Sequence, residues 1–121
     1  MTDKDIIFQH LCRHYCSVMD GWIPYPSTVL QRQLPHLSLY KVRKYLKELK
    51  SEGLIVSDLY VDMGDDRPIL IRGYTLTVAG RNTEMCKQAH EEERELCKKC
   101  FHFDIGPAKN YSVEVDDLFD L

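Results

Sequence analysis

The sequence predicts an α+β fold in which three helices precede a β-hairpin and a long helix follows it. Up to Gly53, apolar residues recur about every 3.6 positions, which is typical of amphipathic helices. In residues 54–77 the period becomes two, with apolar and β-branched residues on both sides of the acidic run 62–68, as in a hairpin. The helical period returns in residues 78–101. Few architectures accommodate this order in one small domain.

The first helix is expected over residues 5–19, where Ile7, Leu11 and Tyr15 fall on one face. The next segment, residues 22–26, contains two prolines, which restrict the residues before them to extended conformations. A short strand or connector is therefore predicted between the first two helices.

The second and third helices are bounded by residues that commonly begin and end helices. Pro26 is followed by two hydroxyl residues, so a helix with a capping hydroxyl is expected to begin there and to end at Pro35. Ser38 is expected to cap the third helix, which runs to the C-terminal signal Gly53. A helix, a tight turn and a further helix are therefore predicted ahead of the hairpin.

The last helix is expected to begin after Thr77 and to continue through residues 78–101. Its apolar residues Met85, Ala89 and Leu96 form only one narrow stripe. So thin a stripe buries little surface within a single chain, which favours pairing with another helix.

Composition and charge are those of an ordinary globular protein. Hydrophobic residues make up 44% of the 121 residues, as in one compact domain. The net charge of −3 does not by itself indicate a nucleic-acid or membrane partner. The charge is unevenly distributed, because residues 1–81 carry +2 and residues 82–121 carry −5. The two parts of the chain are therefore expected to have different roles.

No segment reaches the roughly 18 uncharged apolar residues that a membrane-spanning helix needs, and the N-terminal region has no signal-peptide core. We therefore expect a soluble, cytoplasmic protein without a membrane partner. The five cysteines are then expected to be reduced thiols rather than a disulfide framework.

Two segments carry a resemblance to a known family. PSTVLQRQLPHLSLYKVRKYLKELKSEGLI (residues 26–55) and YTLTVAG (residues 74–80) resemble the helix-turn-helix and wing of winged-helix transcription factors, especially small repressors of the MarR and PadR kind. The resemblance covers about residues 5–101. It implies a winged helix-turn-helix fold, with a three-helix core, a β-hairpin wing and a long C-terminal helix.

The resemblance divides the chain into three parts. Residues 1–80 would form a winged-helix DNA-binding domain, and residues 81–103 a C-terminal helix for dimerisation. Residues 104–121 are expected to be an acidic, loosely ordered tail. No separate ligand domain is expected, so any effector would bind between the helices or at a subunit interface.

The third helix is the expected recognition helix of a small transcriptional regulator. Val42, Leu46 and Leu49 share one side, whereas the opposite side is basic. Residues 38–52 carry five basic and two acidic side chains in a protein that is negative overall. Such a helix fits the major groove of B-DNA, which is about 12 Å wide. A solvated Lys/Glu face is the alternative interpretation.

The pattern and the resemblance together assign roles at an interface with double-stranded DNA. Side chains near the start of the third helix would reach bases, and basic residues farther along would hold phosphates. Polar side chains at the start of the second helix could donate hydrogen bonds to phosphate. The residues expected to contact DNA are Ser27, Thr28, Gln31, Ser38, Tyr40, Lys41, Arg43, Lys44, Lys47 and Arg67.

The hairpin tip departs from the family pattern. A wing that enters the minor groove is usually basic, whereas this tip carries Asp62, Asp65 and Asp66 against Arg67. An alternative is therefore a winged-helix protein-interaction module that does not bind DNA. Salt-dependent affinity for random duplex distinguishes the two, because phosphate contacts release counterions.

A homodimer is expected through the last helix, with contacts that also use the first. It would set two recognition helices about 34 Å apart, one turn of DNA, and so imply a roughly palindromic site. The residues expected at the dimer seam are Met85, Ala89, Leu96 and Cys100.

A catalytic or metal centre is not expected. Cys97 and Cys100 form a CxxC pair, and Cys12 and Cys16 lie one helical turn apart, which would allow a four-thiolate metal site. Packing is favoured, because free cysteines behave as small hydrophobes, so neither metal nor cofactor is expected; a thiol switch stays open. The sequence has no phosphate-binding glycine loop and no hydrolase motif, so an enzyme is not expected.

Overall fold

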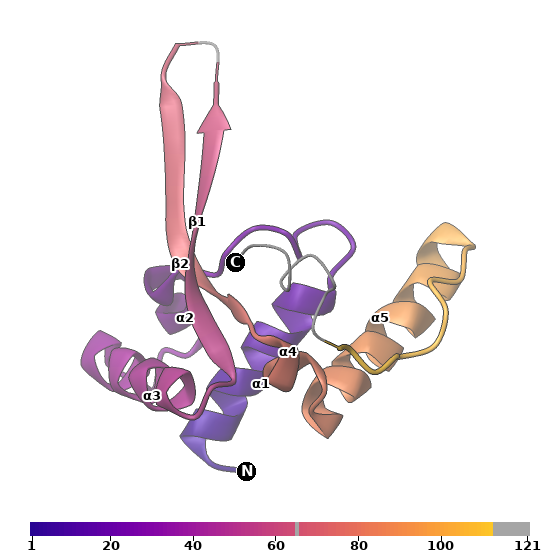
Figure 1. The fold of residues 1–121 in the computed structure, drawn as a ribbon, viewed down its shortest axis with the longest axis horizontal. Helices are drawn as coiled ribbons and strands as arrows, with labels where there is room; N and C mark the ends of the chain where they lie inside the picture. Colours follow the sequence, from indigo (N-terminus) through magenta and orange to yellow (C-terminus); the bar gives the residue numbers. More distant parts are fainter. Residues whose placement is uncertain (65, 113–121) are drawn as a thin grey trace.

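Residues 1–64 and 66–112 are described by the computed structural model, and they form an α+β fold of five helices and one two-stranded antiparallel sheet (Figure 1). This confirms the predicted α+β class, with helices before and after a β-hairpin. The hairpin projects away from the helices (Figure 1). No helix in this part of the chain is long and apolar enough to cross a bilayer. The elements are α1 (Asp3–Cys16), α2 (Ser27–Gln33), α3 (Leu39–Ser51), β1 (Ile55–Met63), β2 (Pro68–Leu76), α4 (Val78–Arg81) and α5 (Glu84–Phe101).

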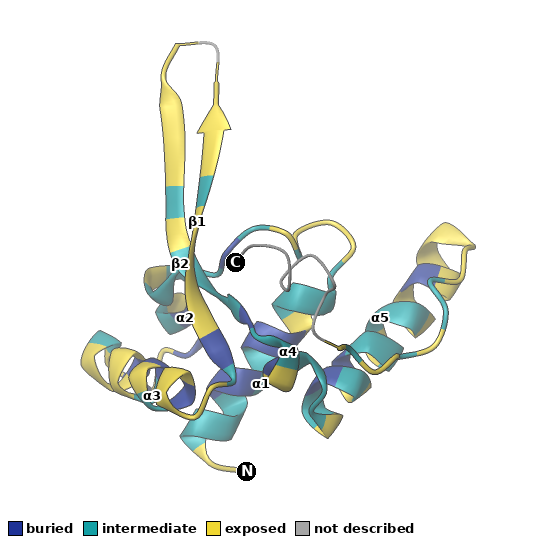
Figure 2. Ribbon diagram, viewed as in Figure 1, coloured by how far each residue is buried: buried dark blue, intermediate teal, exposed yellow. Residues whose placement is uncertain are grey.

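The core lies between α1, α2, α3, α5 and the base of the hairpin, where buried residues gather on the inner faces of the elements (Figure 2). Helix α5 packs against α1, and its residues Cys86 and Ala89 belong to the same buried cluster as Ile7 and Leu46. The expected boundary near residue 80 therefore does not separate two cores. Helix α5 is part of the domain that the earlier elements form.

Helix α1 begins and ends earlier than the predicted residues 5–19. Thr2 caps it, because its hydroxyl accepts a hydrogen bond from the Asp5 amide at 3.1 Å while the Asp5 carboxylate accepts one from the Thr2 amide at 3.1 Å. The helix ends before Ser17, which is extended with φ −64° and ψ 126°. The last three residues of the predicted helix therefore lie in a loop.

Between α1 and α2 the chain turns over residues 18–22, and of the predicted extended segment 22–26 Tyr25 forms a single β-bridge with Tyr74 of β2. Each of the two backbone amides donates to the other residue's carbonyl oxygen, at 2.9 and 3.0 Å. Gly73 permits this approach, because a Cβ there would collide with the Tyr25 backbone. Helix α2 has Pro26 as its N-cap and no side-chain cap, so the predicted capping hydroxyl is wrong: Ser27 is already the first helical residue.

The hairpin is anchored at its base and exposed beyond it. Ile55 of β1 pairs with Leu76 of β2, and both are buried in the core. Toward the tip most residues of both strands are exposed (Figure 2). Midway along, the Tyr60 ring packs edge-on to the ring of Trp22, with centroids 4.8 Å apart. The predicted hairpin is confirmed, and its outer part extends past the packed body of the protein.

The single helix predicted over residues 78–101 is two helices, α4 and α5, interrupted just before Glu84. The Thr83 hydroxyl accepts a hydrogen bond from the Cys86 amide at 3.2 Å and donates one to the Gly80 carbonyl oxygen at 2.8 Å. Thr83 therefore acts as the N-cap of a new helix and does not continue the preceding one.

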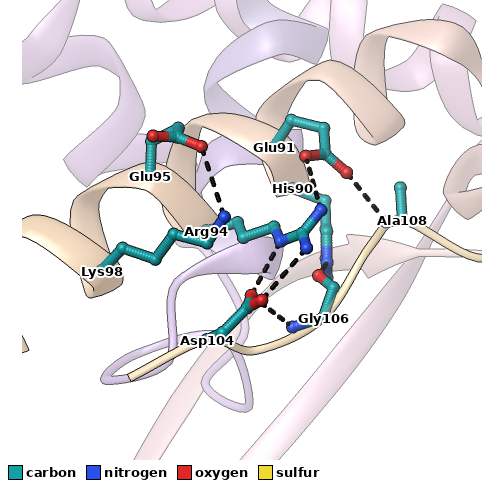
Figure 3. A network of polar contacts seen from close by, with 8 residues as sticks. All are labelled: His90, Glu91, Arg94, Glu95, Lys98, Asp104, Gly106 and Ala108. Atoms are coloured by element: carbon teal, nitrogen blue, oxygen red, sulfur yellow. Dashed lines mark hydrogen bonds and ion pairs between the residues drawn. The ribbon is translucent and has the colours of Figure 1, made fainter. Parts of the chain in front are cut away.

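After α5 the chain turns at His102, whose φ of 58° is left-handed, and residues 104–111 run back along α5 (Figure 3). Arg94 holds this returning segment through two hydrogen bonds to Asp104, Nε to Oδ1 at 2.7 Å and Nη2 to Oδ2 at 3.0 Å. These hydrogen bonds lower the pKa of Asp104 well below its ordinary value and raise that of Arg94.

Two further contacts hold the returning segment. The Ala108 amide donates to Glu91 Oε1 at 2.9 Å (Figure 3). The Asn82 side chain donates to the Tyr111 carbonyl oxygen at 2.9 Å and accepts from the Tyr111 amide at 2.6 Å. Residues 104–111, which the sequence assigns to a loosely ordered tail, are thus joined to α5 and to Asn82 by side-chain contacts. The rest of that prediction, on residues 113–121, lies outside the described residues.

Candidate nucleic-acid interface

Helix α3 has one buried and one exposed face, as its pattern predicts. Val42, Leu46 and Leu49 are buried in the core. Ser38 caps the helix, because its hydroxyl accepts a hydrogen bond at 3.2 Å from the amide three residues later. Gly53 follows the helix with a φ of 78°, a left-handed conformation that favours glycine. Local signals thus set both ends of α3, and the burial of its apolar side leaves the opposite side exposed.

The outward face of α3 is basic. Tyr40 is 77% exposed in the first turn. In the part of the chain that the structure describes, none of the four predicted cations of this face lies within 4.0 Å of a carboxylate oxygen, so their charges are available to an anionic partner. These exposed cations, here called the α3 basic face, are Lys41, Arg43, Lys44 and Lys47.

The acidic residues at the end of α3 are engaged elsewhere. Lys4 of α1 places its Nζ 2.5 Å from Glu52 Oε1 and 4.0 Å from Glu48 Oε2. The hydrogen bond with Glu52 raises the pKa of Lys4. Because α1 supplies this cation, the carboxylates are partly neutralised and the α3 basic face keeps its positive charge.

The three residues of α2 that are predicted to contact DNA differ in exposure and in their contacts within the protein. Ser27 is half-buried and Thr28 is exposed in the first turn. Gln31 is used within the fold, because its Nε2 donates to the Leu37 carbonyl oxygen at 3.2 Å and so braces the turn between α2 and α3. Its predicted role as a phosphate donor is therefore replaced by a structural one.

An open groove of about 460 Å³ lies between the start of α2 and the base of the hairpin. Its lining includes Ser27, Ser57 and Arg72. Lys50, near the end of α3, donates from Nζ to Ser57 Oγ at 3.1 Å. This lysine is missing from the predicted site, because its meeting with β1 is a tertiary contact that no local pattern contains. This contact links the end of α3 to the strand that lines the groove.

Arg67 follows the hairpin tip in sequence and is exposed. The tip lies far from α3, so Arg67 does not belong to the α3 basic face (Figure 1). The hairpin is instead rich in exposed apolar side chains, each at least 42% exposed. The sequence does not distinguish these side chains from core residues, because apolar residues alternate in the same way in a strand that projects from its domain and in one that packs on it. These residues, here called the apolar wing, are Val56, Leu59, Val61, Met63, Ile69 and Leu70.

The four residues predicted at the dimer seam differ in how far they are buried. Ala89 is 4% exposed and Met85 packs against the core, so these two residues stabilise the single chain. The prediction is corrected at Ala89, which is buried within the single chain. Met85 is half-buried and lines an open groove with Gln9 and Arg13 of α1. Farther along α5, Leu96 is 50% exposed and Cys100 is exposed. Leu96 and Cys100 are therefore the seam residues most accessible to a partner.

The cysteines are paired differently from the four-thiolate arrangement that their spacing would allow. Cys16 lies against Cys86, a residue outside that arrangement, with 3.8 Å between the sulfurs. Within residues 1–64 and 66–112, no three His, Cys, Asp or Glu side chains are placed to hold a metal ion.

Comparisons of this chain with protein-family models, with curated proteins and with solved structures gave no match. We therefore infer function from the position and charge of α3 and from the exposed surface of the hairpin.

Proposed function

We propose that this chain is a winged-helix protein that binds double-stranded DNA as a small cytoplasmic transcriptional regulator. The observation that supports this most is the α3 basic face, which is exposed and free of ion pairs within the described residues, while Lys4 engages the carboxylates of Glu48 and Glu52. A helix with one packed face and one unpaired cationic face is suited to the major groove.

Each part of α3 has its own role in this proposal. Tyr40 and Lys41, in the first turn next to Ser38, reach base edges and so set sequence preference. Lys44 and Lys47, one turn apart, hold phosphates and so set affinity and register. Arg43 also contacts the backbone from the flank of the helix. Ser27 and Thr28 lie at the start of α2 and approach the same strand of DNA.

The proposed regulator is a homodimer in which the outer part of α5 meets a second copy. Leu96 and Cys100 are its exposed apolar and thiol side chains, and Phe101 is 57% exposed beside them. Two-fold pairing would place the two α3 helices about one DNA turn apart, roughly 34 Å, and would select an approximately palindromic site.

The test is binding of random duplex DNA over a salt series. The double variant Lys44→Ala/Lys47→Ala should weaken binding to all sequences and lower the salt slope by about one unit for each phosphate interaction that is removed. The matched control is Lys98→Ala/Lys99→Ala, which removes the same charge from α5 and should leave the slope unchanged. If the α3 variant bound as tightly as the parent at low salt, the assignment of α3 would be wrong.

A second candidate is a protein-interaction module, and the apolar wing favours it. Exposed apolar side chains on a projecting hairpin suit a protein surface better than a minor groove. The acidic residues Asp58, Asp62 and Asp66 on the same hairpin are exposed as well and would repel phosphate. In that case random duplex would bind weakly at every salt concentration, and the Lys44→Ala/Lys47→Ala change would have no effect.

A further inference from the structure

Three cysteines from distant parts of the chain meet where α1 ends and α5 begins. The sulfurs of Cys16 and Cys86 are 3.8 Å apart, and the Cys16 thiol also lies 3.6 Å from the Cys86 carbonyl oxygen. Cys12, one turn earlier on α1, is buried in the same core cluster as Cys86. The packing of α1 against α5 thus brings together thiols that are 70 positions apart in the chain.

Cys86 has surroundings that favour a thiolate. Hydrogen bonding with the neighbouring thiols of Cys12 and Cys16, together with the nearby positive charge of Arg81, lowers the pKa of Cys86. Cys86 is also in the first turn of α5, where the helix dipole stabilises negative charge. The same hydrogen bonds raise the pKa values of Cys12 and Cys16, which therefore keep their protons.

The pair is reachable by a small molecule. Cys16 is half-buried and lines an open pocket of about 400 Å³ together with Trp22 and His90. Cys86 and Cys16 both line a small adjoining crevice under Tyr111 of the returning segment. His90 holds that segment through a 2.9 Å contact between its Nε2 and the Gly106 carbonyl oxygen (Figure 3). Cys86 itself is only 3% exposed, so hydrogen peroxide reaches its sulfur through a local opening of the returning segment over this crevice.

We propose that Cys16 and Cys86 are a reactive thiol pair, which hydrogen peroxide converts into an intramolecular disulfide that links α1 to α5. A disulfide requires about 2.05 Å between the sulfurs, so the present 3.8 Å contact needs only a small movement of the two side chains. Cys12 is the less suitable partner, because it is fully buried. This inference concerns the thiols alone and does not depend on DNA binding.

The chemistry proceeds in two steps. The Cys86 thiolate attacks one oxygen of hydrogen peroxide, so that an S–O bond forms, the O–O bond breaks and hydroxide leaves and takes up a proton to become water. The Cys16 sulfur then attacks the Cys86 sulfenic acid. The S–S bond forms as the S–O bond breaks, and the hydroxyl leaves as water with the Cys16 proton. Two thiols are oxidised by two electrons, and one peroxide becomes two waters.

The chain offers a direct test, because trypsin places each cysteine in a separate peptide. The folded protein is treated with hydrogen peroxide, its free thiols are alkylated, and tryptic peptides are identified by mass spectrometry. We expect peptide 14–32, with Cys16, linked to peptide 82–87, with Cys86, as the main cross-link within the monomer. Dithiothreitol should release both peptides. Treatment in concentrated urea should reduce the yield of this link several-fold.

Cysteine variants distinguish the Cys16–Cys86 link from links that involve the other cysteines. Cys16→Ser and Cys86→Ser should each abolish the link, whereas the matched control Cys100→Ser should leave its yield unchanged. A main link between peptides 5–13 and 82–87 would overturn the proposal in favour of Cys12. The proposal also fails if the monomeric parent protein keeps both Cys16 and Cys86 alkylatable after oxidation, or if the link forms equally well in urea.

Discussion

Lys4 in the first turn of α1 lies against Glu52 at the end of α3, with its Nζ 2.5 Å from Oε1. The pair joins two helices whose residues are 48 positions apart in the chain. Its effect is to hold negative charge at the end of α3 that packs on α1, away from the exposed cations of the α3 basic face. Helix α3 therefore has a partly neutralised end and a positively charged outer face.

We expect Leu46→Ala to lower the free energy of unfolding by about 2 to 5 kcal/mol, because it removes a fully buried side chain and leaves a cavity. Chemical denaturation monitored by circular dichroism measures the loss. The matched control is Leu96→Ala on α5, where the side chain is half exposed and the change should be about 1 kcal/mol or less in the monomer. Equal losses at the two positions would contradict the packing of α3.

Changes at Tyr40 and Lys41 should alter which DNA sequence is preferred, with little effect on stability, because both side chains are exposed. Loss of a base contact is expected to cost about 1 to 3 kcal/mol of discrimination. Selection of bound sites from a random duplex library, for parent and variants, measures the preference. A change that lowered affinity for every sequence equally would assign these residues to the backbone instead.

Gly80→Ala should destabilise the protein, because a Cβ at this position of α4 would collide with the Leu54 carbonyl oxygen. The backbone cannot move aside as a flexible side chain would, so we expect a loss of about 1 to 3 kcal/mol, as for overpacking elsewhere. Thermal unfolding measures the loss. Ala79→Ser adds one heavy atom at the neighbouring exposed residue and should be nearly neutral.

Asp104→Asn should lower the thermal midpoint at neutral pH and have less effect in acid. Arg94 lowers the pKa of Asp104 in the folded protein, so this carboxylate stabilises the fold above its unfolded pKa of about 3.9. That contribution is lost as the pH falls from about 4 through the lower folded value. The gap between parent and variant should therefore narrow between pH 7 and pH 3. Asp20→Asn, at an exposed residue, should produce no comparable gap at either pH.

Leu96→Asp should shift the proposed homodimer toward monomer at micromolar concentration, because a charge on the exposed part of α5 would have to be buried at the interface. Sedimentation velocity measures the distribution. Met63→Asp places the same charge on the apolar wing and serves as the control. If Met63→Asp dissociated the dimer and Leu96→Asp did not, the contact would lie on the hairpin.

Much of the fold follows from local signals in the sequence. Ser38 and Gly53 bound α3 because capping and left-handed glycine are properties of a few adjacent residues. The exposed position of Lys44 and Lys47 follows from the helical period alone. Periodicity and capping signals therefore predict the bounds of α3 and the exposed side of the helix on which its lysines lie.

The break before α5 depends on a local signal that the helical period hides, because Thr83 caps α5 through hydrogen bonds to Gly80 and Cys86, each three positions away. Other features depend on contacts between distant residues. Asp104 belongs to a segment of tail-like composition, and it is held by an arginine ten positions earlier. The Cys16 and Cys86 sulfurs meet only because α1 and α5 pack together. Local period and composition predict none of these meetings.

The projecting hairpin also bears on how the protein avoids assembling with itself. Beyond the Tyr25–Tyr74 bridge, the two strands pair with no further strand that the structure describes, so their outer backbone groups can accept a foreign strand. Apolar side chains beside such open edges favour edge-to-edge aggregation. Asp58, Asp62 and Asp66 are exposed along the same stretch, and they set like charges against any second hairpin that approaches. The exposed aspartates of the hairpin thus oppose aggregation of the protein through its strand edges.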